Sequence, residues 1–162
     1  MFIEMFTKNQ IVFAQDDYKL LDNICIGEYK TKDIETRMKY LLSSIKELEC
    51  RYVNYILKNL SHKYEFREEM FTQRKSDPTG NGAIEHIATE EELEDAFDSF
   101  KTIYDNLFCY YEKVMFVEMM LLGRSKEAML EYLNIGTEKF YHVKKSLLVK
   151  LAIGLNWESI RN

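Results

Sequence analysis

Two long segments of the chain carry apolar residues at alternating spacings of four and three, which is the pattern of an amphipathic helix. In the segment from residue 33 to residue 63, the apolar positions on one side are Ile34, Met38, Leu41, Ile45, Leu48, Tyr52 and Tyr55. In the segment that begins near residue 89, they are Leu93, Phe97, Phe100, Tyr104, Leu107, Tyr111 and Val114. The pattern therefore predicts two long helices, and it leaves open a break in the second one near Cys109.

Turn-forming residues and capping signals lie around these segments. Asp16 and Asp17 suit the start of a short helix that ends at Gly27. Residues 75–82 include a proline, two glycines and an asparagine, which predict a loop. The following Thr89-Glu-Glu-Glu92 has the spacing of a capping box, so it predicts the start of the second long helix.

Composition supports a helical protein. The 162 residues contain one proline and six glycines, which are few for a protein of many strands and turns. Hydrophobic residues make up 46% of the chain, enough for a buried core. We expect an all-α fold in which long N-terminal helices form a bundle. The expected regions are residues 1–75, a linker at 76–88, and residues 89–162.

The last part of the second region predicts three shorter helices, at about residues 110–155. Gly123 ends the first of them, and Ser125 can cap the second. Asn134-Ile135-Gly136 suits a tight turn, because Asn and Gly tolerate the left-handed conformation. Thr137 is the expected cap of the third helix. Two helices joined by such a turn predict a helix-turn-helix module.

The third helix has two chemically different sides. Its apolar side consists of Phe140, Val143, Leu147, Leu148 and Leu151, and its opposite side of Glu138, Tyr141, His142, Lys145 and Ser146. This division is typical of a helix that packs on a core and reads DNA with its other face. The DNA-binding residues predicted from the two helices are Ser125, Lys126, Thr137, Glu138, Lys139, Tyr141, His142, Lys145 and Ser146. Lys144 falls on the inner side, and Lys150, like Lys139, can reach phosphates from the edge of the apolar side.

Charge is unevenly distributed along the chain. The net charge is −5, but residues 124–162 hold seven Lys or Arg and four Asp or Glu. The preceding 123 residues then hold 15 basic and 23 acidic residues. A basic end on an acidic body is what a DNA-contacting end module would produce.

The motif of this basic end also resembles a known family. Gly123-x-Ser125-x-Glu127, Leu133-x-Ile135 and the run from Phe140 to Leu151 resemble the DNA-binding region four of bacterial sigma factors. The layout more narrowly resembles the phage-encoded ArpU/RinA-like regulators, which join such an end to an acidic helical part. The resemblance implies a regulator of late or lysis genes, double-stranded promoter DNA as ligand, and host RNA polymerase as a partner. Because each copy offers few lysines, we also expect a homodimer.

A second hypothesis comes from a different functional class. Leu130 and Leu147 stand where the motif usually has small residues, and the predicted recognition helix has no arginine to read guanine. These features, with the acidic body, favour a protein-interaction module, such as an inhibitor of a host factor or defence nuclease. A DNA-packaging recognition subunit is a third alternative.

Other chemistry has little support in the sequence. The three histidines are isolated, no Cys-x-x-Cys pair occurs, and no glycine-rich phosphate loop is present, so we expect no metal, no cofactor and no catalytic residues. We therefore expect a protein that is not an enzyme. Three widely spaced cysteines favour a reducing compartment. No apolar run approaches a membrane span and the first residues do not resemble a secretory signal, so we expect a cytoplasmic protein without membrane contact.

Overall fold

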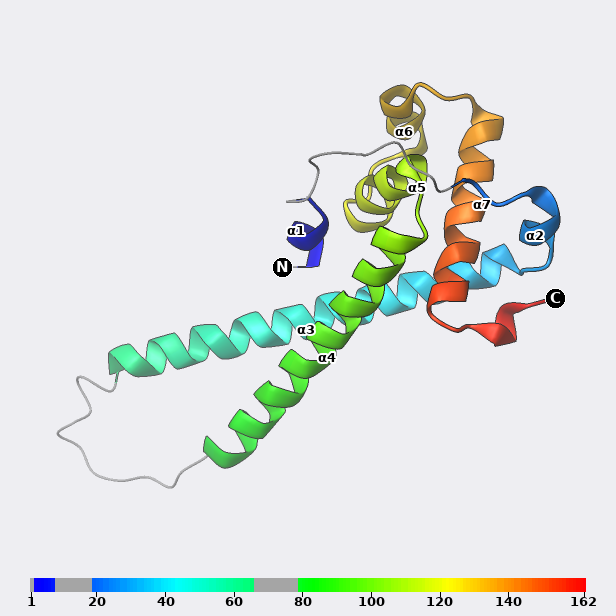
Figure 1. Cartoon of the computed structure of the whole chain (residues 1–162). Coiled ribbons are helices and arrows are strands. Elements are labelled where there is room, and N and C mark those ends of the chain that lie inside the picture. Colours follow the sequence, from blue (N-terminus) through cyan, green and yellow to red (C-terminus); the bar gives the residue numbers. More distant parts are fainter. Residues whose placement is uncertain (1, 8–18, 66–78) are drawn as a thin grey trace. The chain divides into compact units, whose positions relative to one another are not determined.

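The computed structural model describes residues 2–7, 19–65 and 79–162 (Figure 1). Its helices are α1 (Phe2–Thr7), α2 (Asn23–Gly27), α3 (Thr31–Glu65), α4 (Thr79–Asn106), α5 (Tyr110–Met115), the π-helix η2 (Phe116–Leu121), α6 (Lys126–Leu133), α7 (Thr137–Gly154) and the 3-10 helix η3 (Glu158–Ile160). The described residues form no strand, and one isolated bridge joins Tyr29 to Arg161. The all-α prediction is confirmed.

The chain divides into two compact units. Unit 1 contains residues 1–42 and 97–162, and unit 2 contains residues 43–96. The long helices α3 and α4 each contribute residues to both units. Every contact described below lies within unit 1.

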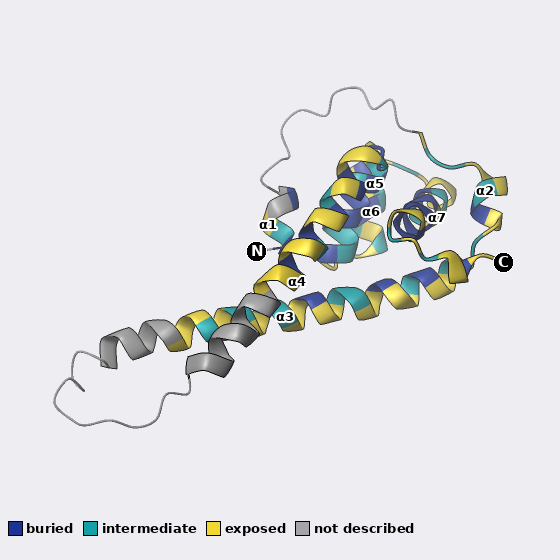
Figure 2. Cartoon of the chain, turned by 60° about the horizontal axis from the view of Figure 1, so that its bottom comes forward, coloured by how far each residue is buried: buried dark blue, intermediate teal, exposed yellow. Residues whose placement is uncertain are grey.

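Helix α3 confirms the first apolar pattern. It runs from Thr31 to Glu65, close to the predicted residues 33–63. Ile34, Met38 and Ile45 are buried, whereas the other positions of the pattern are half-buried (Figure 2): Leu41, Leu48, Tyr52 and Tyr55. The four-three spacing thus predicted both the helix and the side of it that is least exposed.

Helix α4 corrects the predicted loop and linker. The loop at 75–82 and the linker at 76–88 overlap a helix that already begins at Thr79, so both predictions are wrong from that residue on. Thr89 lies inside α4, and the predicted capping box therefore does not start a helix. Glycine lowers helix propensity by only about 1 kcal/mol per residue, a cost that a helix of 28 residues can absorb. Residues 75–78 lie outside the described residues.

The short helix α2 begins later than the sequence suggested. Its N-cap is Asp22, whose carboxylate accepts the Cys25 N–H at 2.8 Å. Asp16 and Asp17, the predicted start, lie outside the described residues. The helix ends at Gly27, as expected.

Phenylalanines form the centre of unit 1. The Phe116 ring contacts those of Phe6, Phe100 and Phe108, with ring centroids 5.4, 5.8 and 5.6 Å apart. All four side chains are almost completely buried. Phe6 comes from α1, so this first helix is part of the core. The sequence pattern did not predict this.

The expected break near Cys109 is confirmed, and it has a polar cause. Helix α4 ends at Asn106 and α5 begins at Tyr110, with Cys109 as its N-cap. The Cys109 N–H donates to the Glu112 carboxylate at 2.8 Å. Burial, and then the Glu112 charge, raise the pKa of the Cys109 thiol. This cysteine is therefore a protonated, buried thiol.

Glu112 is also the centre of a buried polar cluster, which we call the Glu112 cluster: Glu112, Ser146 and Lys150. Lys150 Nζ donates to Glu112 Oε2 at 2.7 Å, and the Ser146 hydroxyl donates to Glu112 Oε1 at 2.5 Å. The relative exposure of the Glu112 and Lys150 side chains is 0% and 7%. The cluster joins α5 to α7, and each of its charges has a partner.

The same cluster holds the segment before α2. The Ser146 hydroxyl accepts the Leu21 N–H at 2.9 Å, and Lys150 Nζ donates to the Lys19 carbonyl at 2.9 Å. His142 Nε2 lies 2.7 Å from the Leu21 carbonyl oxygen. Residues 142, 146 and 150 are four apart and thus share one side of α7. We call residues 19–21 the strap, because they cover this side.

Removal of the Lys150 charge tests the cluster. We expect Lys150→Met to lower the free energy of unfolding by about 3–5 kcal/mol, because the Glu112 carboxylate would stay buried without its counter-ion. Urea denaturation measures the change. The exposed Lys145→Met is the matched control and should stay within about 0.5 kcal/mol of the parent. Equal stability of the two variants would contradict a buried ion pair.

Candidate nucleic-acid interface

The two short helices and the turn predicted after Gly123 form largely as their residues predict. Gly123, at a φ of +71°, ends the preceding helix, and the Ser125 hydroxyl accepts the Ala128 N–H at 3.2 Å to cap α6. Asn134 adopts the left-handed conformation, with a φ of 50° and a ψ of 51°, between α6 and α7. This turn lets α7 leave in a new direction from the end of α6.

The predicted cap of α7 is wrong by one residue. Gly136 is the N-cap, with an extended backbone, and its carbonyl accepts the Phe140 N–H at 3.0 Å. Thr137 is the first residue of the helix and stays exposed. Because glycine has no side chain, the first turn of α7 has no side-chain cap.

The apolar side of α7 is the one predicted. Each of its five residues has 3% or less of its surface exposed: Phe140, Val143, Leu147, Leu148 and Leu151. Met129 and Leu133 of α6 are buried as well. Leu147, the bulky residue in place of a small one, is thus accommodated in the core.

Most of the predicted DNA-binding residues lie on one end of the module. Lys126 Nζ donates to the Tyr141 hydroxyl at 3.0 Å, so the first turn of α6 meets α7 at this end. Lys126 is half-buried, and the remaining members are exposed: Ser125, Thr137, Glu138, Lys139, Tyr141 and Lys145. We call these seven residues the α6–α7 tip.

Aromatic rings position two of the lysines at this tip. Lys126 Nζ lies 4.5 Å from the centre of the Tyr141 ring, and Lys139 Nζ lies 4.2 Å from that of Tyr111. The hydrogen bond from Lys126, with its positive charge, lowers the pKa of the Tyr141 hydroxyl. Both ammonium groups thus lie within cation–π distance of an aromatic ring.

Two predicted site residues are not available for DNA in this structure. Ser146 is fully buried and belongs to the Glu112 cluster. His142 is half-buried and contacts the strap through Leu21. Helical spacing placed both on the polar side of α7 correctly, but that side is covered by protein rather than open to a ligand.

Of two further lysines, Lys150 differs from its expected role and Lys144 does not. Lys150, expected to reach phosphates, is buried in its ion pair with Glu112. Lys144 donates to Glu35 of α3 at 3.0 Å, in keeping with its position on the inner side. The cations that α7 presents to solvent are therefore concentrated in its first turns, at Lys139 and Lys145.

Arg124 is a surface cation that the predicted site did not include. It immediately precedes Ser125, is exposed, and forms an ion pair with Glu118 of η2. Its place next to the α6 N-terminus puts it at the edge of the α6–α7 tip. A basic residue directly before a helix cap was the signal available in the sequence.

Comparison with known proteins adds no relative: no family model, no curated protein and no solved structure matches the chain. The resemblance to the sigma region four and to the ArpU/RinA-like regulators therefore stays a hypothesis. Among the described residues, no helix is both long and apolar enough to cross a bilayer.

Asn134 offers a test of the turn. We expect Asn134→Ala to lower the free energy of unfolding by about 1 kcal/mol, because a Cβ-bearing residue without a local polar group disfavours the left-handed conformation. Asn134→Gly is the matched control and should be at least as stable as the parent. Thermal denaturation of the three proteins measures both effects, and a stable alanine variant would contradict the turn geometry.

Cysteine reactivity tests the burial of Cys109. We expect iodoacetamide to modify the exposed Cys50 in the native protein and to leave Cys109 unmodified, because the thiolate is the nucleophile and burial raises the Cys109 pKa. In urea, Cys109 should react as well. Peptide mass spectrometry reads out both sites, and fast native labelling of Cys109 would show that its surroundings open.

Proposed function

We propose that this chain is a transcription regulator that binds double-stranded DNA with the α6–α7 tip. The observation that carries the proposal is the hydrogen bond between Lys126 and Tyr141 at the exposed end of α6 and α7, with Lys139 and Lys145 exposed on the same helix as Tyr141. A helix docked in the major groove contacts bases with its N-terminal residues, while the helix before it contacts the backbone. The exposed residues in the first turn of α7 and at the start of α6 support this mode of binding.

The individual contacts follow from side-chain chemistry. Lys126, Lys139 and Lys145 supply positive charge for phosphates, and the N-terminus of α6 adds its dipole. Glu138, on the first turn of α7, can accept a hydrogen bond from a cytosine amino group. The Tyr141 hydroxyl can donate a hydrogen bond to a phosphate or to a base acceptor. We expect phosphate contacts to dominate affinity.

The strap limits the length of α7 that can read DNA. His142 and Ser146 are occupied by the strap, so base contacts would come from residues 137–141, with Lys145 at the boundary. Such a short reading surface with few cations predicts weak binding by one copy. Two copies on repeated half-sites would remedy this, which supports a homodimer as part of the proposal.

The cellular role rests on the resemblance. Control of late or lysis genes in a phage or prophage, together with contact to host RNA polymerase, would suit a module like the sigma region four. The alternative is a protein-interaction module, for example an inhibitor of a host factor. The observation that favours it is that the strap and the Glu112 cluster cover the second half of the expected reading face.

Charge reversal at the α6–α7 tip tests DNA binding. A library of random double-stranded DNA is first selected on the protein at low salt, and affinity for the selected sequence is then measured by fluorescence anisotropy. We expect Lys145→Glu to weaken binding by about tenfold or more and to reduce the slope of log affinity against log salt by about 0.9. Lys32→Glu, at an exposed position of α3, is the matched control and should leave both unchanged.

Two results would reject the proposal. One is failure to enrich any DNA sequence at low salt, and the other is an equal effect of the two reversals. If instead a host protein is captured, and Lys145→Glu but not Lys32→Glu abolishes the capture, the interaction module is the better account.

A further inference from the structure

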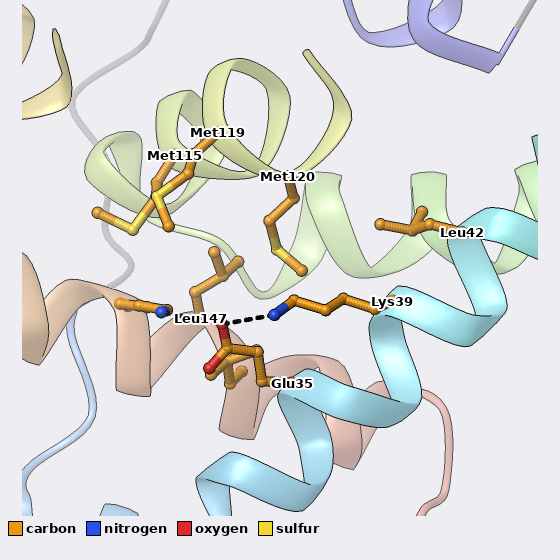
Figure 3. A pocket seen from close by; sticks show the side chains of 9 residues that line it. Glu35, Lys39, Leu42, Met115, Met119, Met120 and Leu147 are labelled. Atoms are coloured by element: carbon orange, nitrogen blue, oxygen red, sulfur yellow. Dashed lines mark hydrogen bonds and ion pairs between the residues drawn. The ribbon is translucent and has the colours of Figure 1, made fainter. Parts of the chain in front are cut away.

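Unit 1 contains a small apolar pocket on the side of α7 that faces α3 and η2. Its volume is about 140 Å³. Figure 3 shows Met115, Met119 and Met120 above it, with Glu35 and Lys39 of α3 at its edge. Leu42 and the α7 residues Lys144, Leu147 and Leu148 complete the lining. A cavity of roughly 150 Å³ with apolar walls is large enough to bind benzene.

The π-helix η2 accounts for the methionine wall. The Leu122 N–H donates to the Val117 carbonyl, five residues earlier, at 3.0 Å. In an α-helix, residues five apart point about 140° away from each other. The wider turn of a π-helix brings such residues closer to one face, so Met115 and Met120 can line one pocket. Single π turns inside helices occur frequently at functional sites.

The edge of the pocket has an excess of positive charge. Glu35 Oε1 lies 3.0 Å from Lys144 Nζ and 3.5 Å from Lys39 Nζ, so two ammonium groups share one carboxylate. Burial of the Glu35 carboxyl acts to raise its pKa, but the hydrogen bond and charge of Lys144 outweigh this and lower it. Glu35 is therefore ionised, and one positive charge is left over at the edge. Lys39, which is 77% exposed, is the lysine that can turn to another anion.

We propose that this pocket binds a small monocarboxylic acid with an apolar body about the size of a benzene ring. The apolar body lies among the three methionines, whose flexible thioether side chains adapt to its shape. The carboxylate pairs with Lys39 at the edge. A single excess charge favours a monoanion over a phosphate or a dicarboxylate, which would carry more charge than the edge can balance.

The inference does not depend on DNA binding. The pocket and the α6–α7 tip use different residues, and ligand binding can be measured without DNA. Failure of the DNA experiments would therefore leave the pocket untouched, and failure of the pocket would leave the proposed function untouched.

Methyl NMR of the methionines gives a direct test in the full chain. We expect titration of benzoate into protein labelled with ¹³C at the methionine methyl groups to shift Met115, Met119 and Met120. Met129, buried in α6 and not part of the lining, is the internal control and should not move. Replacement of each methionine by leucine assigns the signals. The absence of shifts, or equal shifts at Met129, would overturn the proposed site.

Charge specificity gives the second test. Benzamide, which has nearly the shape of benzoate without the charge, should bind about tenfold more weakly or worse. Lys39→Met should weaken benzoate binding by about threefold to fivefold, because Lys39 is exposed, whereas Lys32→Met, at an exposed position of the same helix, should change it less than about twofold. Calorimetric titration of both variants measures the affinities. Equal affinity for benzoate and benzamide, or equal affinity of the two variants, would overturn the carboxylate assignment.

Discussion

The buried contact between Glu112 and Lys150 is the interaction on which the arrangement of unit 1 depends. The same carboxylate caps α5 through Cys109, receives the hydroxyl of Ser146, and neutralises Lys150. Because a buried carboxylate needs such partners, it fixes α5, α7 and the strap relative to one another. The contacts of the cluster join α5, α7 and the strap, and together they restrict where α7 can lie.

This constraint divides α7 into three sides with different roles. Its leucines, valine and phenylalanine face the core, and residues 142, 146 and 150 face the strap. The side that remains open to a ligand carries Tyr141 and Lys145. Tyr141 contacts Lys126 of α6 on this side. The proposed DNA surface is therefore smaller than a helical wheel implies. The proposed acid pocket uses a further part of the same helix, near Lys144, so α7 contributes residues to both proposed sites.

Local signals in the chain predicted the local structure well. The four-three spacing predicted α3 and the later part of α4, and Gly123, Ser125 and Asn134 marked the ends of the shorter helices. The errors came where local signals compete. Gly80 and Gly82 suggested a loop, but the long helix α4 tolerates them. Thr89 could cap a helix N-terminus, but it lies inside α4, where no helix begins. Ser125, Thr137, Glu138, Lys139, Tyr141 and Lys145 are exposed as predicted.

By itself, the sequence determined the helical class, the turn between α6 and α7 and which side of α7 is apolar, because these depend on spacing and on residues within one turn. Only the tertiary structure decided what covers the polar side. Ser146 and Lys150 look like surface residues by spacing, yet Glu112, more than thirty positions away, and the strap, more than a hundred away, bury them. The methionine pocket likewise required a π turn, whose five-residue hydrogen bonds leave no periodic trace in the sequence.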